Sequence, residues 1–288
     1  MSHSHFVNVN GLRLRYLDDG SAEDTRPVIV LYHATGFVAE LWDPLIRELH
    51  AEYRCIALDQ RGHGHSDKSA PEHTWAWTAD DFEKFLDALG LRHVIGIGHS
   101  SGATAIAVIA GRRPELIERA VLIEPTVRAK VLPATAPGYV SPMVERTRGR
   151  RARWPDRESL YSALLERPPY SSWASEMKAL FAEFAVAPNA QGELELMCPP
   201  AVEAEIYGSF LRFDPWPDLA RVRQPILLIH GTGPSIMATT RVDEVMPALP
   251  SARLVELPEG GHLILMEAPQ AVARAVKAFL QGAPRQTI

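Results

Sequence analysis

Short apolar runs alternate with longer amphipathic segments along the chain up to residue 123. Runs rich in β-branched residues predict strands buried on both faces, and apolar residues that recur every three or four positions predict helices. After a hairpin predicted at 6–9 and 12–17 around Asn10-Gly11, the predicted strands are 27–32, 54–58, 93–97 and 120–123, and the helices are 39–50 and 78–89. This order predicts an α/β fold of βαβ units around a mostly parallel sheet.

The strand rhythm stops after Glu124 and returns roughly a hundred residues later, with strands predicted at 224–230 and 253–257 and a closing helix at 268–280. A gap of this length is too long for a loop in a compact domain, so we predict an inserted segment with its own structure. The predicted organisation is an α/β core of residues 1–125 and 224–288 and a helical cap of residues 126–223, called the lid below. Its aromatic residues are numerous enough to wall a pocket.

Composition narrows the function classes. The chain has 288 residues, 46% of them hydrophobic, and a formal net charge of -5. This balance gives no reason to expect a nucleic-acid or anionic-membrane partner. The longest apolar stretch, 103–110, is shorter than the roughly 18 residues that cross a bilayer. We therefore expect a small-molecule substrate, no nucleic-acid partner and no membrane partner, and the sequence leaves a homodimer open.

Cysteine usage and the N-terminal residues suggest a compartment. Cys55 and Cys198 lie far apart and form no CxxC pair, which suits a reducing environment. The first residues contain neither a basic region nor an apolar region of the kind that signal peptides carry. We expect a cytoplasmic protein that needs no cofactor.

The strongest chemical signal is the sequence Gly-His-Ser-Ser-Gly at 98–102, between a predicted strand and an apolar helix. In a G-x-S-x-G turn the small residues Gly98 and Gly102 allow a sharp bend that projects Ser100 from the sheet. The helix that follows directs its first amides at this serine, so the Ser101 N–H is placed to stabilise an oxyanion. A serine nucleophile also needs a base, and His262, on a loop after the last predicted strand, is the best candidate.

Four motifs in this order resemble an α/β-hydrolase with a lid over essentially the whole chain. They are His-Ala-Thr-Gly-Phe at 33–37, Asp-Gln-Arg-Gly-His-Gly-His-Ser at 59–66, the Ser100 turn and the Gly-His pair at 261–262. The resemblance implies an α/β-hydrolase fold with a mostly parallel sheet and an inserted helical cap. It also implies a second oxyanion N–H at Thr35, with Gly36 as the neighbouring alternative, although the usual His-Gly pair is His33-Ala34 here.

The triad acid departs from the common pattern of that family. Most relatives have an aspartate soon after the strand equivalent to 224–230, but residues 231–237 contain no carboxylate. The first acid downstream, Asp243, lies in a predicted helix. Glu124 ends the preceding strand, and adjacent parallel strands end at the same edge of a sheet. Glu124 is therefore the candidate partner that orients His262, the alternative being a carboxylate that only caps the start of the lid.

This acid position resembles that of the zearalenone-type lactonases, which share Ser-Ser-Gly-Ala at the elbow, here 100–103, and Glu-Pro-Thr, here 124–126. We therefore expect a serine hydrolase that cleaves an ester or lactone of a small, largely apolar molecule through an acyl-enzyme. The alternatives are a carbon–carbon bond hydrolase of a diketone-like aromatic breakdown product and a low-turnover ligand receptor. Haloalkane dehalogenases and epoxide hydrolases of this family use an aspartate at the elbow. The serine here therefore argues against both activities.

Two further motifs have simpler explanations. His63, His65 and Asp67 fit an H-x-H-x-D metal pattern, but the same residues fit the glycine-rich loop of the hydrolase family, so no metal site is expected. An arginine-rich run at 146–153 is typical of a solvated helix face. The alternative is that it attracts an anionic substrate to the mouth of the pocket.

Overall fold

The chain is described by a computed structural model that covers residues 3–21, 23–68, 72–131, 140–235 and 240–282. The predicted core and lid ranges therefore include some positions outside the described residues, among them 132–139 of the lid with Pro133 and Pro137, and 236–237 of the segment after the returning strand.

An eight-stranded sheet forms the centre of the fold, in the order β1-β2-β4-β3-β5-β6-β10-β11. Its strands are β1 (His3–Val9), β2 (Leu12–Asp18), β3 (Val28–Tyr32), β4 (Arg54–Leu58), β5 (Val94–His99), β6 (Ile117–Ile123), β10 (Ile226–Gly231) and β11 (Ala252–Leu257). The hairpin of β1 and β2 is antiparallel, and the pairs from β4 to β11 are parallel. Asn10 and Gly11 both have positive φ, as a tight hairpin turn requires. The predicted α/β-hydrolase fold with a mostly parallel sheet is confirmed.

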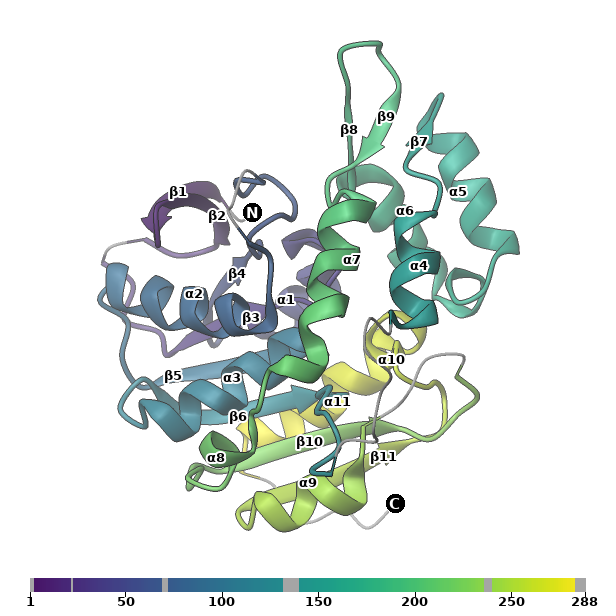
Figure 1. Ribbon diagram of the computed structural model, residues 1–288. Coiled ribbons are helices and arrows are strands. Elements are labelled where there is room, and N and C mark those ends of the chain that lie inside the picture. The colour runs from purple at the N-terminus through teal and green to yellow at the C-terminus, as the bar shows by residue number, and fades with distance from the viewer. Residues whose placement is uncertain (1–2, 22, 69–71, 132–139, 236–239, 283–288) are drawn as a thin grey trace.

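Helices cover both faces of this sheet (Figure 1). One face carries α2 (Trp75–Ala88), α3 (Ser101–Arg112), α8 (Trp216–Leu219) and α9 (Val242–Ala248), and the other carries α1 (Asp43–Leu49), α10 (Ile264–Glu267) and α11 (Pro269–Leu280). The predicted helix 39–50 is divided, because a 3-10 turn η1 (Ala39–Trp42) precedes Pro44 near the start of α1. Side chains alternate between the two faces, so Leu31 and Tyr32 enter different clusters.

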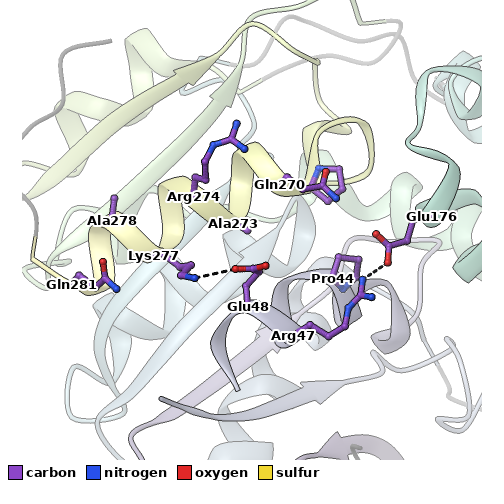
Figure 2. A pocket seen from close by; sticks show the side chains of 11 residues that line it. Pro44, Arg47, Glu48, Glu176, Gln270, Ala273, Arg274, Lys277, Ala278 and Gln281 are labelled. Atoms are coloured by element: carbon purple, nitrogen blue, oxygen red, sulfur yellow. Dashed lines mark hydrogen bonds and ion pairs between the residues drawn. The ribbon is translucent and has the colours of Figure 1, made fainter. Parts of the chain in front are cut away.

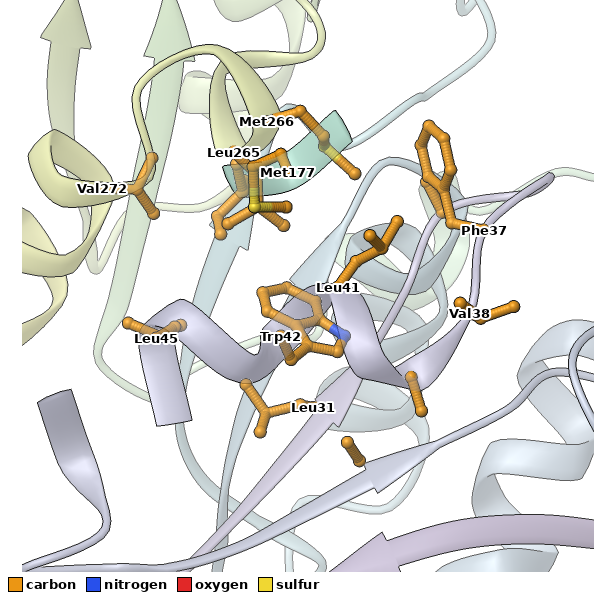
Figure 3. Close-up of a cluster of buried hydrophobic side chains, with 14 of the residues drawn as sticks. Leu31, Phe37, Val38, Leu41, Trp42, Leu45, Met177, Leu265, Met266 and Val272 are labelled. Atoms are coloured by element: carbon orange, nitrogen blue, oxygen red, sulfur yellow. The ribbon is translucent and has the colours of Figure 1, made fainter. Parts of the chain in front are cut away.

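One of these clusters joins the core to the lid. Trp42 is fully buried beside the turn after β3, and Figure 3 shows Met177 of the lid and Met266 of α10 gathered with it. Because the lid shares this apolar core, it is held against the sheet by burial and not only by its two connections.

The segment between β6 and β10 contains more than helices. Its elements before α8 are α4 (Pro142–Arg148), β7 (Arg153–Trp154), α5 (Arg157–Glu166), η2 (Tyr170–Ser172), α6 (Ser175–Phe184), β8 (Val186–Pro188), β9 (Leu194–Leu196), α7 (Pro200–Ser209) and η3 (Phe210–Arg212). The strands form a small separate sheet in the order β7-β9-β8, which the sequence analysis did not predict because strands of two or three residues leave no periodic signal. In Figure 1, α7 runs from these elements toward the core.

Among the described residues, no helix combines the length and the apolar character needed to span a bilayer.

Candidate active site

Ser100 stands at a strained turn between β5 and α3. Its φ of 53° and ψ of -115° lie in a region that non-glycine residues rarely adopt. The turn is tight because Gly98 and Gly102 lack side chains: a Cβ on Gly98 would lie 2.5 Å from the Ala103 nitrogen, and one on Gly102 would collide with the Tyr32 carbonyl. The structure therefore has the strand-turn-helix context that the sequence predicts for a nucleophile elbow.

His262 reaches this serine from the loop between β11 and α10. Its Nε2 lies 3.1 Å from Ser100 Oγ. Its backbone is held by His99, whose Nε2–H donates to the His262 carbonyl at 2.8 Å. Burial, followed by the neighbouring His262 ring, lowers the pKa of His99 to about 3, so His99 is neutral at ordinary pH. His99 is thus packed inside the elbow, where it also positions the candidate base.

Glu124 occupies the other side of the His262 ring. It directly follows β6 and has a positive φ of 47°, and its Oε2 lies 3.3 Å from His262 Nδ1. The carboxylate is fully buried and also accepts the amides of Gly231 at 2.7 Å and Thr240 at 2.9 Å. The structure thus brings Ser100, His262 and Glu124 together in one hydrogen-bonded line.

The charge state of Glu124 fixes the proton positions in this line. Burial by itself raises the pKa of the carboxyl, but the hydrogen bond and charge of His262, with the amides of Gly231 and Thr240, hold the pKa below its ordinary value. An ionised carboxylate only accepts hydrogen bonds, so His262 carries its proton on Nδ1. Nε2 is then the acceptor for the Ser100 hydroxyl, as a general base requires.

His230 shares the same carboxylate, a contact that the sequence analysis missed. Its Nδ1 lies 2.7 Å from Glu124 Oε1, the oxygen that does not face His262. In the parallel pairing of β6 with β10, Ile123 lies opposite Ile229. The residues that follow them, Glu124 and His230, are therefore neighbours, and the register of these two strands would have indicated the contact. Asp243 is exposed on α9, in the helix predicted for it.

Thr126, the threonine of the Glu-Pro-Thr motif, is a second residue at the site to which the sequence assigned no role. Its Oγ1 lies 3.0 Å from Ser100 Oγ. Because the serine proton is directed at His262, the threonine hydroxyl is the donor in this contact. The Thr104 hydroxyl donates to the Thr126 carbonyl at 2.8 Å, so the first residues of the lid segment are tied to α3 beside the nucleophile.

The candidate oxyanion donors lie at the turn after β3 and at the start of α3. Thr35 N–H donates to the Ser101 hydroxyl at 2.9 Å, whereas Gly36 N–H donates to His63 Nε2 at 2.9 Å. Ser101 N–H is at the first position of α3, where helix amides have no partner within the helix. Of the two positions considered after β3, Gly36 is therefore engaged by a buried imidazole, and Thr35 lies beside Ser101.

A comparison with family models decides the family, because residues 28–275 match the model of the Alpha/beta hydrolase family. The chain belongs to this family. Its sequence is 24% identical over 281 residues to 2-(acetamidomethylene)succinate hydrolase of Mesorhizobium japonicum, covering 97% of this chain and 95% of that protein.

Solved structures of α/β-hydrolases resemble the fold closely. The crystal structure of E-2-(acetamidomethylene)succinate hydrolase has a TM-score of 0.82 at 23% identity, covering 98% of this chain and all of that one. The enol-lactonase of Burkholderia xenovorans has a TM-score of 0.74 at 25% identity, covering 96% of this chain and 100% of its own. The relatives are hydrolases with different named substrates.

Two hollows of this α/β-hydrolase are lined by none of the candidate catalytic residues Ser100, His262 and Glu124. One, of about 780 Å³, lies between α1 and α11 and is lined by charged side chains such as Glu48 and Lys277, which pair at 3.0 Å (Figure 2). The other, of about 260 Å³, lies between η2 of the lid and the loop beside His262. The charged walls of the first suit solvent better than an apolar acyl group.

Aromatic side chains from the core and the lid meet near the nucleophile turn. Phe37 stacks with His99 at 6.2 Å between ring centroids and contacts Trp173 and Phe181 of the lid edge-on. The lid thus supplies an apolar wall beside the elbow, in agreement with the aromatic content noted in its sequence. Within the described ranges, no three His, Cys, Asp or Glu side chains are grouped to hold a metal ion.

Proposed function

We propose that this α/β-hydrolase is a serine hydrolase that cleaves an ester or lactone of a small molecule through an acyl-enzyme. The observation that carries the proposal is the hydrogen-bonded line from Ser100 through His262 to Glu124, with distances of 3.1 and 3.3 Å. An ionised and buried acid, an imidazole of defined tautomer and a strained serine are the components of nucleophilic acyl transfer.

In the proposed mechanism, Ser100 Oγ attacks the acyl carbon while its proton passes to His262 Nε2. Glu124 stabilises the imidazolium that forms. The amides of Thr35 and Ser101 stabilise the tetrahedral oxyanion, which requires the Ser101 hydroxyl to release the Thr35 N–H. His262 then returns the proton to the leaving oxygen, and water, activated by the same imidazole, releases the acid and restores Ser100.

Ester or lactone cleavage is supported by the likeness to the zearalenone-type lactonases in the acid position at Glu124, and by the similarity to the enol-lactonase of Burkholderia xenovorans. A second candidate is hydrolysis of an amide, because the name of the Mesorhizobium japonicum relative specifies an acetamido compound. The two share the same acyl-enzyme and differ only in the leaving group.

The test is labelling by a fluorophosphonate probe, with mapping of the modified peptide. We expect the adduct on Ser100 in the wild type and none in Ser100→Ala, whose turnover falls about 10⁴-fold or more. A panel of para-nitrophenyl esters, lactones, anilides and a diketone-like vinylogous acid then separates the bond types. An unlabelled Ser100, or turnover of the vinylogous acid alone, would count against the proposal.

A further inference from the structure

Arg150, between α4 and β7 of the lid, is the arginine of the 146–153 run that turns inward. Its Nη1 lies 2.9 Å from Glu203 Oε2 on α7, an ion pair without hydrogen-bond geometry at that oxygen. Its Nε and Nη2 atoms are buried and have no hydrogen-bond partner among the described residues. Two buried donors of a cation are therefore left without a protein acceptor, which is costly unless a ligand or a bound water supplies one.

The other arginines of this run differ. Its other four arginines are exposed, with Arg148 paired to Glu145 at 3.0 Å and Arg153 to Glu195 at 3.5 Å. Arg151 donates to the carbonyl of Arg153 at 2.7 Å. The prediction that this run forms a solvated helix face thus agrees with the exposure of these arginines, but not with the inward position of Arg150.

The buried pair lies against the turn that holds the candidate oxyanion donor. A Cβ on Gly36 would be only 2.9 Å from Glu203 Oε1, so α7 packs its carboxylate directly onto this turn. The adjacent Thr35 amide contacts Ser101 at 2.9 Å. Arg150 therefore pairs with Glu203, Glu203 packs on Gly36, and the adjacent Thr35 contacts Ser101 beside the nucleophile. This series of contacts places the guanidinium on the lid side of the turn after β3.

We propose that the Nε–Nη2 edge of Arg150 binds a carboxylate of the substrate, so that the substrate is an acyl compound that carries a free carboxylate beside its hydrolysed bond. This inference rests on the proposed serine hydrolase function and names its substrate class. The Nε and Nη2 hydrogens of arginine are parallel and match the two oxygens of a carboxylate.

The net charge of Arg150 and Glu203 favours a ligand with one negative charge, such as a carboxylate, over a ligand with two. Glu203 already offsets part of the Arg150 charge, and a phosphate dianion would add two negative charges beside it. Burial raises the pKa of Glu203, and the Arg150 charge and the Tyr207 hydrogen bond do not reverse this. Glu203 can therefore take up a proton when a second carboxylate enters.

The experiment uses para-nitrophenyl hemiesters of succinic, glutaric and adipic acid. Each is compared with a neutral isostere in which an isopropyl group replaces the free carboxylate. The readout is the ratio of kcat/KM for hemiester to kcat/KM for isostere. We expect a ratio above one for at least one chain length in the wild type, and a fall of that ratio by about 10- to 100-fold in Arg150→Met, because hydrogen bonds to charged groups are strong.

The matched control is Arg148→Met, which removes an exposed charge from the same run and should change the ratio less than about twofold. An equal fall in both variants would mean that the general field of the run, not a built site, selects the anion. An unchanged ratio in Arg150→Met, or a wild type that prefers every isostere, would overturn the carboxylate site.

Arg150→Met leaves Glu203 buried without its cation and is at risk of misfolding. Arg150→Lys keeps the charge but loses the fork, and the double variant Arg150→Met/Glu203→Gln removes both charges; we expect the ratio to fall in both. Failure of the proposed function is recognised separately, because then wild-type Ser100 takes up no fluorophosphonate and neither ester of a pair is turned over.

Discussion

Two buried carboxylates lie on opposite sides of the nucleophile turn, Glu124 at the sheet edge and Glu203 on the lid helix α7. Glu124 accepts from two backbone amides, two imidazoles and the Thr240 hydroxyl. Glu203 lies beside one guanidinium and near the Tyr207 hydroxyl. The sheet edge therefore holds a charge whose acceptors are satisfied, whereas the lid holds one whose surroundings still contain unused donors.

The two pKa values move in opposite directions for this reason. At Glu124 the donors outweigh the effect of burial and the pKa is lowered, while at Glu203 burial prevails and the pKa is raised. A fixed anion suits the orientation of a base in every catalytic cycle. An acid that can change its charge suits the proposed carboxylate site, at which a charged substrate would bind and a charged product would leave.

The largest effect is expected when the charge of Glu124 is removed. Glu124→Gln keeps the shape but cannot impose the Nδ1–H tautomer on His262, so we expect kcat to fall about 10³- to 10⁴-fold. Steady-state kinetics on a neutral ester measures this. Asp243→Asn, at an exposed position on α9, is the control and should remain within about twofold. A crippled Asp243→Asn beside an active Glu124→Gln would show that the acid is misassigned.

Much of this sheet-edge network was predictable from the sequence. Ser100 follows from its strand-turn-helix context, and Glu124 from its place at the end of a strand in a parallel sheet. The shared partner His230 required only the register of β6 and β10, which strand patterns do not specify. The predicted role of each residue in catalysis stays a prediction that the variants test.

The lid network was not predictable in the same way. Arg150 lies in a run that is typical of a solvated surface, and its ion pair with Glu203 joins residues separated by six further elements of secondary structure. The short strands β7, β8 and β9 that shape this region have no periodic signal. Long-range pairing in an irregular insertion depends on packing, which local patterns do not encode.

A smaller effect is expected when Glu124 loses one of its partners. His230→Ala removes the donor 2.7 Å from Oε1, but the amides of Gly231 and Thr240 remain, so we expect kcat to fall about 10-fold with little change in KM. Rescue by His230→Asn, whose amide nitrogen replaces Nδ1, would identify His230 as a positioning residue. A loss that Asn does not restore would instead indicate that the ring is needed for packing.

The opposite pKa shifts predict opposite effects of pH on stability. The stabilisation from Glu124, whose folded pKa is lowered, is present above its ordinary value of 4.5 and is lost as pH falls through the folded pKa. For Glu203, whose folded pKa is raised, the stabilisation is present below 4.5 and is lost as pH rises through the folded pKa.

Urea unfolding from acidic to mildly alkaline pH tests these directions with Glu124→Gln and Glu203→Gln. The free energy of unfolding of the wild type minus that of Glu124→Gln should decrease as the pH is lowered. The free energy of unfolding of the wild type minus that of Glu203→Gln should decrease as the pH is raised toward neutral. The side chains that face these carboxylates are His230 and His262 for Glu124, and Arg150 and Tyr207 for Glu203. Slopes of the same sign would remove the distinction between the two acids.

The smallest effect is expected at Thr126, where the chain passes from the sheet edge into the lid. Its hydroxyl donates to Ser100 Oγ at 3.0 Å, which holds the serine in place but occupies only one lone pair, so attack can proceed through another. Thr126→Val should therefore lower kcat about three- to fivefold, and equally for a hemiester and its isostere, since the contact does not reach the proposed carboxylate site. Thr126→Ser should restore the wild-type rate. A fall confined to the hemiester would mean that this border residue belongs to substrate recognition in the lid, and a fall above about 100-fold would mean that its hydroxyl contacts the reacting atoms.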